Sequence, residues 1–397
     1  MQRIGIYGGT YNPPHLGHFR AAEYACGSLK LDKLLMIPTN IPPHKQLPEG
    51  SPTPAERLEM VRLGAEDFEK LEACDLELRR EGASYTWQTV AQLREEYPNA
   101  QLYLLMGTDM FLSFGSWREP QRILQDATLA VFYRGEPGEK AVIDAQKRSL
   151  EEMGARVELV ENPVTDISST ELRRMLTLRC ASEFLPASVE RYVYEHGFYG
   201  THRQLHDLSE EDLERVVTQL LKPSRVPHVL GCRDTAVMLA KRWGADVTDA
   251  ARAALLHDIT KVFDGPLQLT LARSYGMILD DFSARNTKTL HALTGSWVAQ
   301  RIFGENKAVV DAIASHTTGK PGMNVLETII YVADYMEPNR DFPGVEALRE
   351  LAYKDLYGAL ELGLNMTITH LQQQGREISS ESGNTLRWLR SEERKIL

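Results

Sequence analysis

The chain has 397 residues, of which 43% are hydrophobic and 25% charged, and its formal net charge is -10. At roughly 100–200 residues per domain, this length predicts two domains, each large enough to bury its own core. The acidic balance argues against a general binder of nucleic-acid polymers, which usually carries a basic surplus, and favours small nucleotides held by local positive groups.

The first two hundred residues alternate short apolar runs with helical patterns. The apolar runs predict strands at Arg3–Tyr7, Leu34–Pro38, Leu102–Met106, Thr128–Tyr133 and Arg156–Val160. Helical patterns lie between them, for example at Thr53–Gly64, Thr86–Glu96 and Ile143–Met153. This alternation predicts an α/β fold, a doubly wound, Rossmann-like parallel sheet with helices on both faces. In such sheets, ligands bind beyond the carboxyl ends of the strands.

The strand signal ends after about residue 205, where helical periodicity replaces it. This periodicity is seen at Glu210–Leu221, Val226–Trp243, Asp249–His257, His291–Phe303, Ala308–His316, Val325–Met336 and Leu356–Gln372. The second half is therefore expected to be all-α. The change falls near the glycine-containing stretch His196–His202, so we expect a first domain at residues 1–202 and a second at 203–397.

Other features exclude several classes of protein. No stretch reaches the roughly 18 consecutive apolar residues of a membrane span, and the N-terminus has the pattern of a first strand instead of a signal peptide. The 4 cysteines form no C-x-x-C pair, which argues against a disulfide framework and a zinc–thiolate site. We therefore expect a cytoplasmic protein without a membrane partner, with a homo-oligomer as one alternative.

A candidate phosphate-binding segment follows the first predicted strand. Gly8 and Gly9 allow the backbone to turn tightly and approach a ligand. His15 and His18 would share one face at the start of a helix, where two imidazoles beside free N–H groups suit a polyphosphate. A lone histidine or a Gly-Gly turn is more often structural, but H-x-G-H spacing directly after a first strand is rarer. The segment matches neither a Walker loop nor the G-x-G-x-x-G fingerprint.

A second helix start follows the last predicted strand of this half. Ser168 and Glu171 match the S-x-x-E capping box, which by itself indicates only a capped helix. The hydroxyls of Ser169 and Thr170, the free N–H groups of the helix start and the charge of Arg173 would together also form a phosphate-binding site.

Over residues 1–200, these motifs resemble those of the H-x-G-H nucleotidyltransferase superfamily, and in particular the bacterial nicotinate-mononucleotide adenylyltransferases. The segments that carry the resemblance are, in order, GGTYNPPHLGH (8–18), PPHK (42–45), TPAERLEM (53–60), SYT (84–86), MGTD (106–109), Trp117 and ISSTELR (167–173). Sister enzymes that activate pantetheine phosphate or cytidylylate alcohols are not expected to share the P-P-H-K, S-Y-T and G-x-D…W set.

The resemblance implies catalytic roles for His15, His18 and Arg173, with His18 steadying the charge that develops at the α-phosphate of ATP. It implies nucleotide or substrate contacts for Gly8, Gly9, Thr10, Lys45, Thr86, Gly107, Asp109, Trp117, Arg134, Ser168, Ser169 and Thr170. In this reading Gly107 and Asp109 hold a ribose, while Trp117 stacks on the pyridine ring. Arg134 stands in Arg-Gly-Glu-Pro-Gly, where the family often has Arg-Pro-Gly.

The implied reaction transfers AMP from ATP to nicotinate mononucleotide and yields deamido-NAD and pyrophosphate. The 5′-phosphate of the mononucleotide would attack the α-phosphorus in line, without a covalent enzyme intermediate, while the protein supplies positioning and positive charge. Mg²⁺ is expected to enter with the ATP phosphates. Nicotinamide mononucleotide stays open as the alternative acceptor.

The helical half carries a different set of candidate ligands: His228, the adjacent pair His257 and Asp258, His291, His316 and Asp334. Imidazole and carboxylate without thiolate suit iron, manganese or another divalent ion at an open catalytic site. An adjacent His-Asp pair would let the carboxylate bridge two ions about 3.5–4 Å apart, which can clamp a phosphate and generate hydroxide. Each histidine alone is more often a core or surface residue, so the hypothesis depends on the whole set.

This set resembles the HD phosphohydrolase superfamily. The segments His316–Met323 and Tyr331–Arg340 resemble bacterial HD-domain hydrolases that split diadenosine tetraphosphate symmetrically into two ADP. The resemblance implies that the six residues bind two divalent ions, with iron as the expected metal, and makes Lys261 and Arg340 candidate phosphate contacts. The alternative is a nucleotide-binding regulatory module without turnover, against which the complete ligand set argues.

Overall fold

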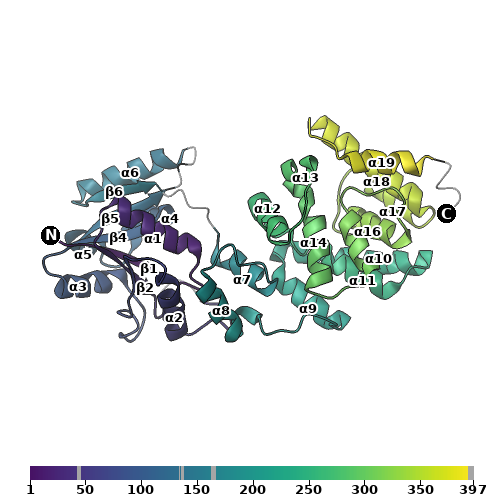
Figure 1. The fold of residues 1–397 in the computed structure, drawn as a ribbon. Coiled ribbons are helices and arrows are strands. Elements are labelled where there is room, and N and C mark those ends of the chain that lie inside the picture. Colours follow the sequence, from purple (N-terminus) through teal and green to yellow (C-terminus); the bar gives the residue numbers. More distant parts are fainter. Residues whose placement is uncertain (43–45, 134, 136–137, 162–166, 392–397) are drawn as a thin grey trace. The chain divides into compact units, whose positions relative to one another are not determined.

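The computed structural model describes residues 1–42, 46–133, 135, 138–161 and 167–391. The chain forms two compact units, Met1–Arg203 and Gln204–Leu397, which Figure 1 colours along the sequence from purple to yellow. The first unit contains a sheet and helices, whereas the described part of the second contains helices and no strand. Among the described residues, no helix combines the length and the apolar character needed to cross a membrane.

A six-stranded parallel sheet forms the centre of the first unit, with the order β3-β2-β1-β4-β5-β6. The strands are β1 (Arg3–Gly9), β2 (Lys33–Pro38), β3 (Leu71–Ala73), β4 (Gln101–Gly107), β5 (Ala127–Tyr133) and β6 (Val157–Glu161). The strand order reverses between β1 and β4, so the carboxyl ends of these two strands flank the switch point where such sheets bind ligands.

Helices cover both faces of the sheet (Figure 1). Leu34 and Met36 of β2 share one core with α1 (Leu16–Ser28) and α2 (Pro54–Ala65). Leu35 and Ile37 belong to the opposite core, to which α3 (Thr86–Glu96), α5 (Pro120–Asp126) and α6 (Glu139–Glu152) contribute. Because both faces are covered, the inner strands β2, β4 and β5 are nearly continuous apolar runs. The unit also contains α4 (Thr108–Leu112), α7 (Ser169–Thr177) and α8 (Ala187–Glu195).

The predicted doubly wound parallel fold is confirmed, with one strand more than expected. The added strand, β3, is only 3 residues long and includes a glutamate, so it gives no apolar run that could be recognised in the sequence. The helix expected at Ile143–Met153 begins earlier, at Glu139, because the apolar residues of its first turn are exposed, with Val142 at 53%, and add nothing to the buried face.

The prediction of an all-α second half is also confirmed within the described residues. The helices are α9 (Glu210–Leu220), α10 (Val226–Trp243), α11 (Val247–Leu256), α12 (Gly265–Ser274), α13 (Asp281–Arg285), α14 (Leu290–Arg301), α15 (Lys307–Ser315), α16 (Val325–Met336), α17 (Val345–Ala352), α18 (Leu356–Gln373) and α19 (Ser380–Leu389). The expected set lacked α12, α13, α17 and α19, each of 10 residues or fewer. Helices α10, α11 and α16 pack against one another and carry or adjoin candidate ligands.

Candidate functional sites

Arg57, on α2, holds the segment that follows β1. Its side chain is fully buried, and its guanidinium donates to the carbonyl oxygens of Thr10 and Thr39 at 2.6 Å and of Asn40 at 3.2 Å. Thr10 follows β1, whereas Thr39 and Asn40 follow β2. One buried cation therefore ties together the carboxyl ends of two neighbouring strands. Arg57 lies within the segment TPAERLEM (53–60), where the sequence gives no sign of this role.

Asn12 is the buried centre of the same segment. Its carbonyl accepts from Nη1 of Arg173 at 2.8 Å, its Oδ1 accepts from the hydroxyl of Tyr199 at 2.8 Å, and its Nδ2 donates to Oγ of Ser51 at 3.0 Å. Nη2 of Arg173 also donates to Oγ1 of Thr170, at 3.0 Å. The sequence predicts no contact between Asn12 and Tyr199, because nothing local signals a contact between residues 187 positions apart.

The structure brings His15 and His18 together at the start of α1. His15 is the N-cap of the helix, and the centroids of the two rings lie 3.7 Å apart. The backbone N–H of His15 donates to Nδ1 of His18 at 3.2 Å. Since this nitrogen accepts a hydrogen bond, the proton of the neutral His18 ring lies on Nε2. His18 can therefore donate a hydrogen bond to a ligand without being charged.

Burial controls the protonation of this pair. It lowers the pKa of His15 to about 4, and burial together with the neighbouring His15 lowers the pKa of His18 well below its ordinary value. Nδ1 of His15 is buried and makes no hydrogen bond within the described part of the chain. A phosphate beside the rings would favour their protonated forms, because an opposite charge raises the pKa of an imidazole. The pair is thus neutral at pH 7 and can gain charge when an anion arrives.

The two glycines at the end of β1 differ in their surroundings. An added Cβ at Gly9 would lie 3.0 Å from the buried ring of Tyr11, so packing accounts for this glycine. An added Cβ at Gly8 would meet nothing within 4 Å, which leaves room beside the backbone. Gly8 therefore fits the predicted close approach to a ligand better than Gly9 does.

The start of α7 contains the predicted capping box. The hydroxyl of Ser168 accepts from the backbone N–H of Glu171, and the backbone N–H of Ser168 donates to Oε2 of Glu171, both at 3.2 Å. The Ser168 hydroxyl is therefore already engaged in capping. Ser169 and Thr170 occupy the first turn, where backbone N–H groups have no partner within the helix, so they are better placed to meet phosphate.

Across the switch point, β4 delivers the next two predicted residues. Gly107 is the last residue of β4 and the N-cap of α4, and Asp109 lies in the first turn of that helix. Both therefore stand at the carboxyl edge of the sheet, the edge at which β1 delivers its glycines. This places the expected ribose contacts and the expected phosphate contacts on the two strands that flank the switch point.

The structure also brings together the segments that carry Thr86 and Trp117. Thr86 is the first residue of α3, and Trp117 follows a single 3₁₀ turn and packs against Phe114, with ring centroids 5.3 Å apart. Their neighbours are in contact, since the Arg118 guanidinium lies 4.7 Å from the centre of the Tyr85 ring. Two further predicted contacts, from Lys45 and Arg134, lie outside the described residues.

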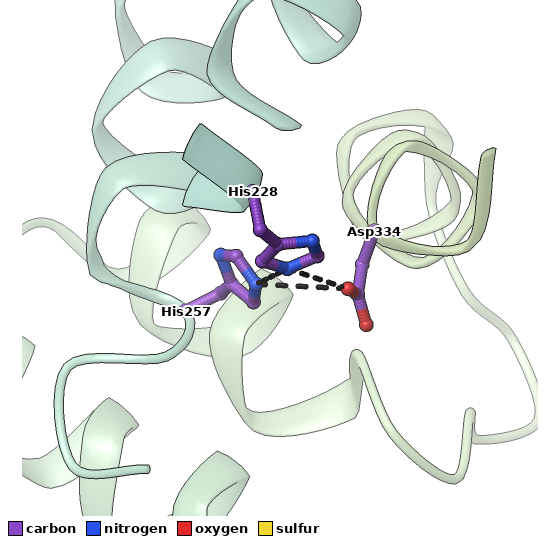
Figure 2. Close-up of side chains that lie close together, drawn as sticks. All are labelled: His228, His257 and Asp334. Atoms are coloured by element: carbon purple, nitrogen blue, oxygen red, sulfur yellow. Dashed lines mark hydrogen bonds and ion pairs between the residues drawn. The ribbon is translucent and has the colours of Figure 1, made fainter. Parts of the chain in front are cut away.

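A second candidate site lies in the helical unit (Figure 2). Nε2 of His228, in the first turn of α10, lies 3.3 Å from Nε2 of His257 and 3.1 Å from Oδ1 of Asp334. His257 directly follows α11, and Asp334 lies on α16. The packing of these three helices therefore brings two imidazoles and a carboxylate together. Their ligand atoms lie within 4.8 Å of one another, close enough to bind one metal ion.

Asp258 connects this group to a second pair of imidazoles. Its Oδ2 lies 3.6 Å from Nε2 of His228 and 3.4 Å from Nε2 of His257. Its Oδ1 lies 3.2 Å from Nε2 of His291, which is itself 3.1 Å from Nε2 of His316. Asp258 is fully buried and presents one oxygen to each pair. The six predicted ligands therefore lie together. Their donor atoms form two groups, one on each side of Asp258, and each group is suited to hold one ion.

Hydrogen bonds fix the orientation of all four imidazoles. Nδ1 of His257, His291 and His316 each lies 2.6–2.8 Å from the backbone carbonyl three residues earlier, so Nδ1 carries the proton. Nδ1 of His228 lies 3.1 Å from Oε1 of Glu337. In the neutral rings every Nε2 therefore presents a lone pair to the centre, and lone pairs this close repel each other unless a proton or a metal ion lies between them. These residues fit a divalent metal ion.

Three cations contact the carboxylates of this centre. Nε of Arg225 donates to Oδ2 of Asp258 at 2.6 Å, and Nζ of Lys261 lies 3.2 Å from Oδ1 of the same residue. Nη2 of Arg340 donates to Oδ1 of Asp334 at 2.6 Å. Lys261 and Arg340, predicted as phosphate contacts, thus border the metal centre. Arg225 lies in a polar turn before the first histidine, where the sequence gives no sign of its partner.

Comparison with known proteins assigns the two units to different families. Residues 6–175 match the family model described as Cytidylyltransferase-like, and residues 225–339 match the HD domain model. The first match contains the histidine pair and the start of α7, and the second contains all six candidate metal ligands. The two candidate sites therefore fall within two separately matched regions of the chain.

Several relatives cover one half of the chain each. A "Probable nicotinate-nucleotide adenylyltransferase" of Halalkalibacterium halodurans is 37% identical over 203 residues, which span 51% of this chain and 93% of the relative. A protein of the same name from Shewanella sp. strain MR-7 is 38% identical over 189 residues, 44% of this chain and 88% of the relative. A solved "predicted HD superfamily hydrolase involved in NAD metabolism" from Clostridium acetobutylicum is 36% identical, with a TM-score of 0.45, over 46% of this chain and 97% of that one.

Proposed function

The first half of this chain belongs to the nicotinate-nucleotide adenylyltransferase family, and from this membership we propose that it transfers AMP from ATP to nicotinate mononucleotide, yielding deamido-NAD and pyrophosphate. The observation that carries the proposal is the pairing of His15 and His18 at the start of α1, beside the switch point of the sheet. A helix start with two imidazoles suits a polyphosphate.

In the proposed reaction, an oxygen of the mononucleotide phosphate attacks the α-phosphorus of ATP while the bond to pyrophosphate breaks. Nε2–H of His18 would donate to an oxygen of the α-phosphate, where negative charge develops. The start of α7, with Thr170 and Arg173, would hold the departing pyrophosphate. ATP would bring Mg²⁺ on its own phosphates. The segment after β1 is held before substrate binds, because Arg57 donates to the carbonyl of Thr10 and Arg173 donates to the carbonyl of Asn12. Little reorganisation therefore accompanies the reaction.

Product analysis on the purified chain tests this proposal. With ATP and nicotinate mononucleotide we expect deamido-NAD and pyrophosphate in equal amounts, at a higher rate than the products formed with nicotinamide mononucleotide. An equal or higher rate with nicotinamide mononucleotide would overturn the proposed acceptor. Preference for pantetheine phosphate would overturn the proposed reaction as a whole.

For the second unit, we propose a metal-dependent phosphohydrolase that splits diadenosine tetraphosphate into two ADP. The observation that carries the hydrolase proposal is the position of Asp258, with one oxygen toward each pair of histidines. Two ions held there would activate a water and clamp a phosphate. Arg225, Lys261 and Arg340, which border the carboxylates, would pair with substrate phosphates. The choice of substrate is supported by the resemblance of the segments His316–Met323 and Tyr331–Arg340.

Incubation of the metal-loaded chain with diadenosine tetraphosphate tests this second proposal. We expect ADP as the only nucleotide product, and its loss on treatment with a chelator. Formation of ATP and AMP would overturn the symmetric cleavage. Tight binding of the substrate without turnover would favour the regulatory nucleotide-binding module instead. His257→Ala should abolish ADP release, because it removes a ligand that contacts both His228 and Asp258.

A further inference from the structure

His228 differs from the other three imidazoles of the candidate metal centre in what lies behind it. His257, His291 and His316 donate from Nδ1 to neutral backbone carbonyls. His228 donates from Nδ1 to the carboxylate of Glu337, whose side chain is only 1% exposed. A carboxylate behind an imidazole fixes its tautomer and makes the opposite nitrogen a stronger metal ligand than a carbonyl does.

The carboxylate of Glu337 is itself held in one orientation. Its Oε2 accepts from the backbone N–H and from Nδ2 of Asn339, at 2.7 and 2.9 Å. Nδ2 of Asn339 also donates to the carbonyl of Pro227, the residue before His228. Nη2 of Arg349 donates to the carbonyl of Glu337 at 2.8 Å and fixes the turn from behind. This turn after α16 therefore connects directly to the first turn of α10.

Gly231, one turn beyond His228 on α10, shows how closely this turn approaches. An added Cβ at Gly231 would lie 2.5 Å from Oε2 of Glu337 and 3.1 Å from Nδ2 of Asn339. A side chain there would therefore displace the carboxylate. The absence of a side chain at this position permits the approach of the two segments, and the contact between His228 and Glu337 depends on it.

We infer that Glu337 is a positioning residue for one of the two ions of the proposed metal centre, on which this inference rests. By holding the proton of His228 on Nδ1, it directs the Nε2 lone pair toward His257 and Asp334. The ion held by these three residues is then bound more tightly than the ion on the other side of Asp258. The carboxylates act in the same direction. Oδ1 of Asp334 and Oδ2 of Asp258 face the ion beside His228, whereas only Oδ1 of Asp258 faces the ion beside His291.

The variant Glu337→Gln separates this role from a general packing role. Three N–H donors surround the carboxylate, from Nδ1 of His228 and from the backbone and Nδ2 of Asn339. Glutamine has a single acceptor oxygen. If that oxygen keeps both bonds to Asn339, the amide nitrogen faces Nδ1 of His228, which must then accept a hydrogen bond. The proton of His228 moves to Nε2, where it blocks metal binding.

Titration of the chelator-stripped full chain with Mn²⁺ alone, followed by calorimetry, tests the inference. The unmodified chain should bind two ions with different affinities. Glu337→Gln should weaken the tighter ion by about 10- to 100-fold and leave the weaker ion unchanged. Gly231→Ala should weaken the same ion, because its methyl group displaces the carboxylate, and it replaces Glu337→Gln if that variant does not fold.

Glu327→Gln is the matched control. Glu327 lies on the same helix as Asp334, seven residues earlier, and is also buried, but its partner is Lys320, at 2.6 Å. This variant should bind both ions as the unmodified chain does. Unchanged affinities in a folded Glu337→Gln protein would overturn the inference, as would equal weakening of both ions. Unequal binding without hydrolysis would support the inference while overturning only the proposed hydrolase activity.

Discussion

The backbone N–H of His15 donates to Nδ1 of His18, and the two rings lie 3.7 Å apart at the start of α1. This hydrogen bond leaves the proton of the neutral His18 ring on Nε2, so His18 is a donor that needs no positive charge. A fixed donor of this kind stabilises charge as it develops, without reorganisation at the moment of reaction. The first site therefore depends on the placement of its groups, which the following substitutions test.

His18→Ala should lower kcat for deamido-NAD formation by about 100- to 1,000-fold, the effect of removing one preorganised donor. The KM for nicotinate mononucleotide should change little, because the lost contact is strongest in the transition state. Steady-state kinetics on the full chain measure both constants. His202→Ala, which alters an exposed histidine of the same unit, should leave kcat unchanged. Similar losses in the two variants would contradict the role of His18.

Acidification should destabilise the chain through His15. The folded chain holds this ring neutral because burial lowers its pKa to about 4, whereas the unfolded chain takes up the proton near pH 6.5. Between these values the unfolded state binds more protons than the folded state. The free energy of unfolding therefore decreases as the pH is lowered, by up to about 1.4 kcal/mol per pH unit for this group. His15→Gln should show a shallower loss between pH 7 and 5 in urea unfolding. An unchanged slope would contradict this prediction.

Arg57→Met should lower the free energy of unfolding by at least about 2 kcal/mol, because it removes the buried donor of three partly buried carbonyl oxygens. It should also raise the KM for ATP, since Thr10 loses its support. Arg62→Met on the same helix is the control, because Arg62 is exposed and its ion pairs with Glu59 and Glu66 are screened by solvent. Urea unfolding of both variants compares their free energies of unfolding. Equal values for the two variants would refute the structural role of Arg57.

Asp258→Asn should abolish hydrolysis while leaving adenylyl transfer intact. Loss of a partner behind a ligand already weakens metal binding by about 10- to 100-fold, so loss of a carboxylate that faces both histidine pairs should exceed about 100-fold for both ions. Mn²⁺ titration and the two activity assays on one preparation give the result. Retention of one ion at full affinity would contradict the shared position of Asp258.

Sequence patterns predicted those parts of the molecule that depend on neighbouring residues. Buried parallel strands are continuous apolar runs, and the serine and glutamate of a capping box are three residues apart, so both were recognisable. The same holds for His15 and His18, which one helical turn brings together. The short strand β3 gave no such pattern, because three residues are too few to show periodicity. It is stabilised by its parallel pairing with β2, which its own sequence does not show.

The contacts that orient both sites were decided by the tertiary structure. Tyr199 reaches Asn12 from 187 positions away, and Glu337 reaches His228 from 109. The sequence by itself determined which chemical groups each half brings, two imidazoles at a helix start and an imidazole–carboxylate set on helices. Which oxygen of Asp258 faces which histidines, and that Lys261 and Arg340 contact carboxylates, followed only from packing, because helix packing sets these distances and sequence separation does not constrain them.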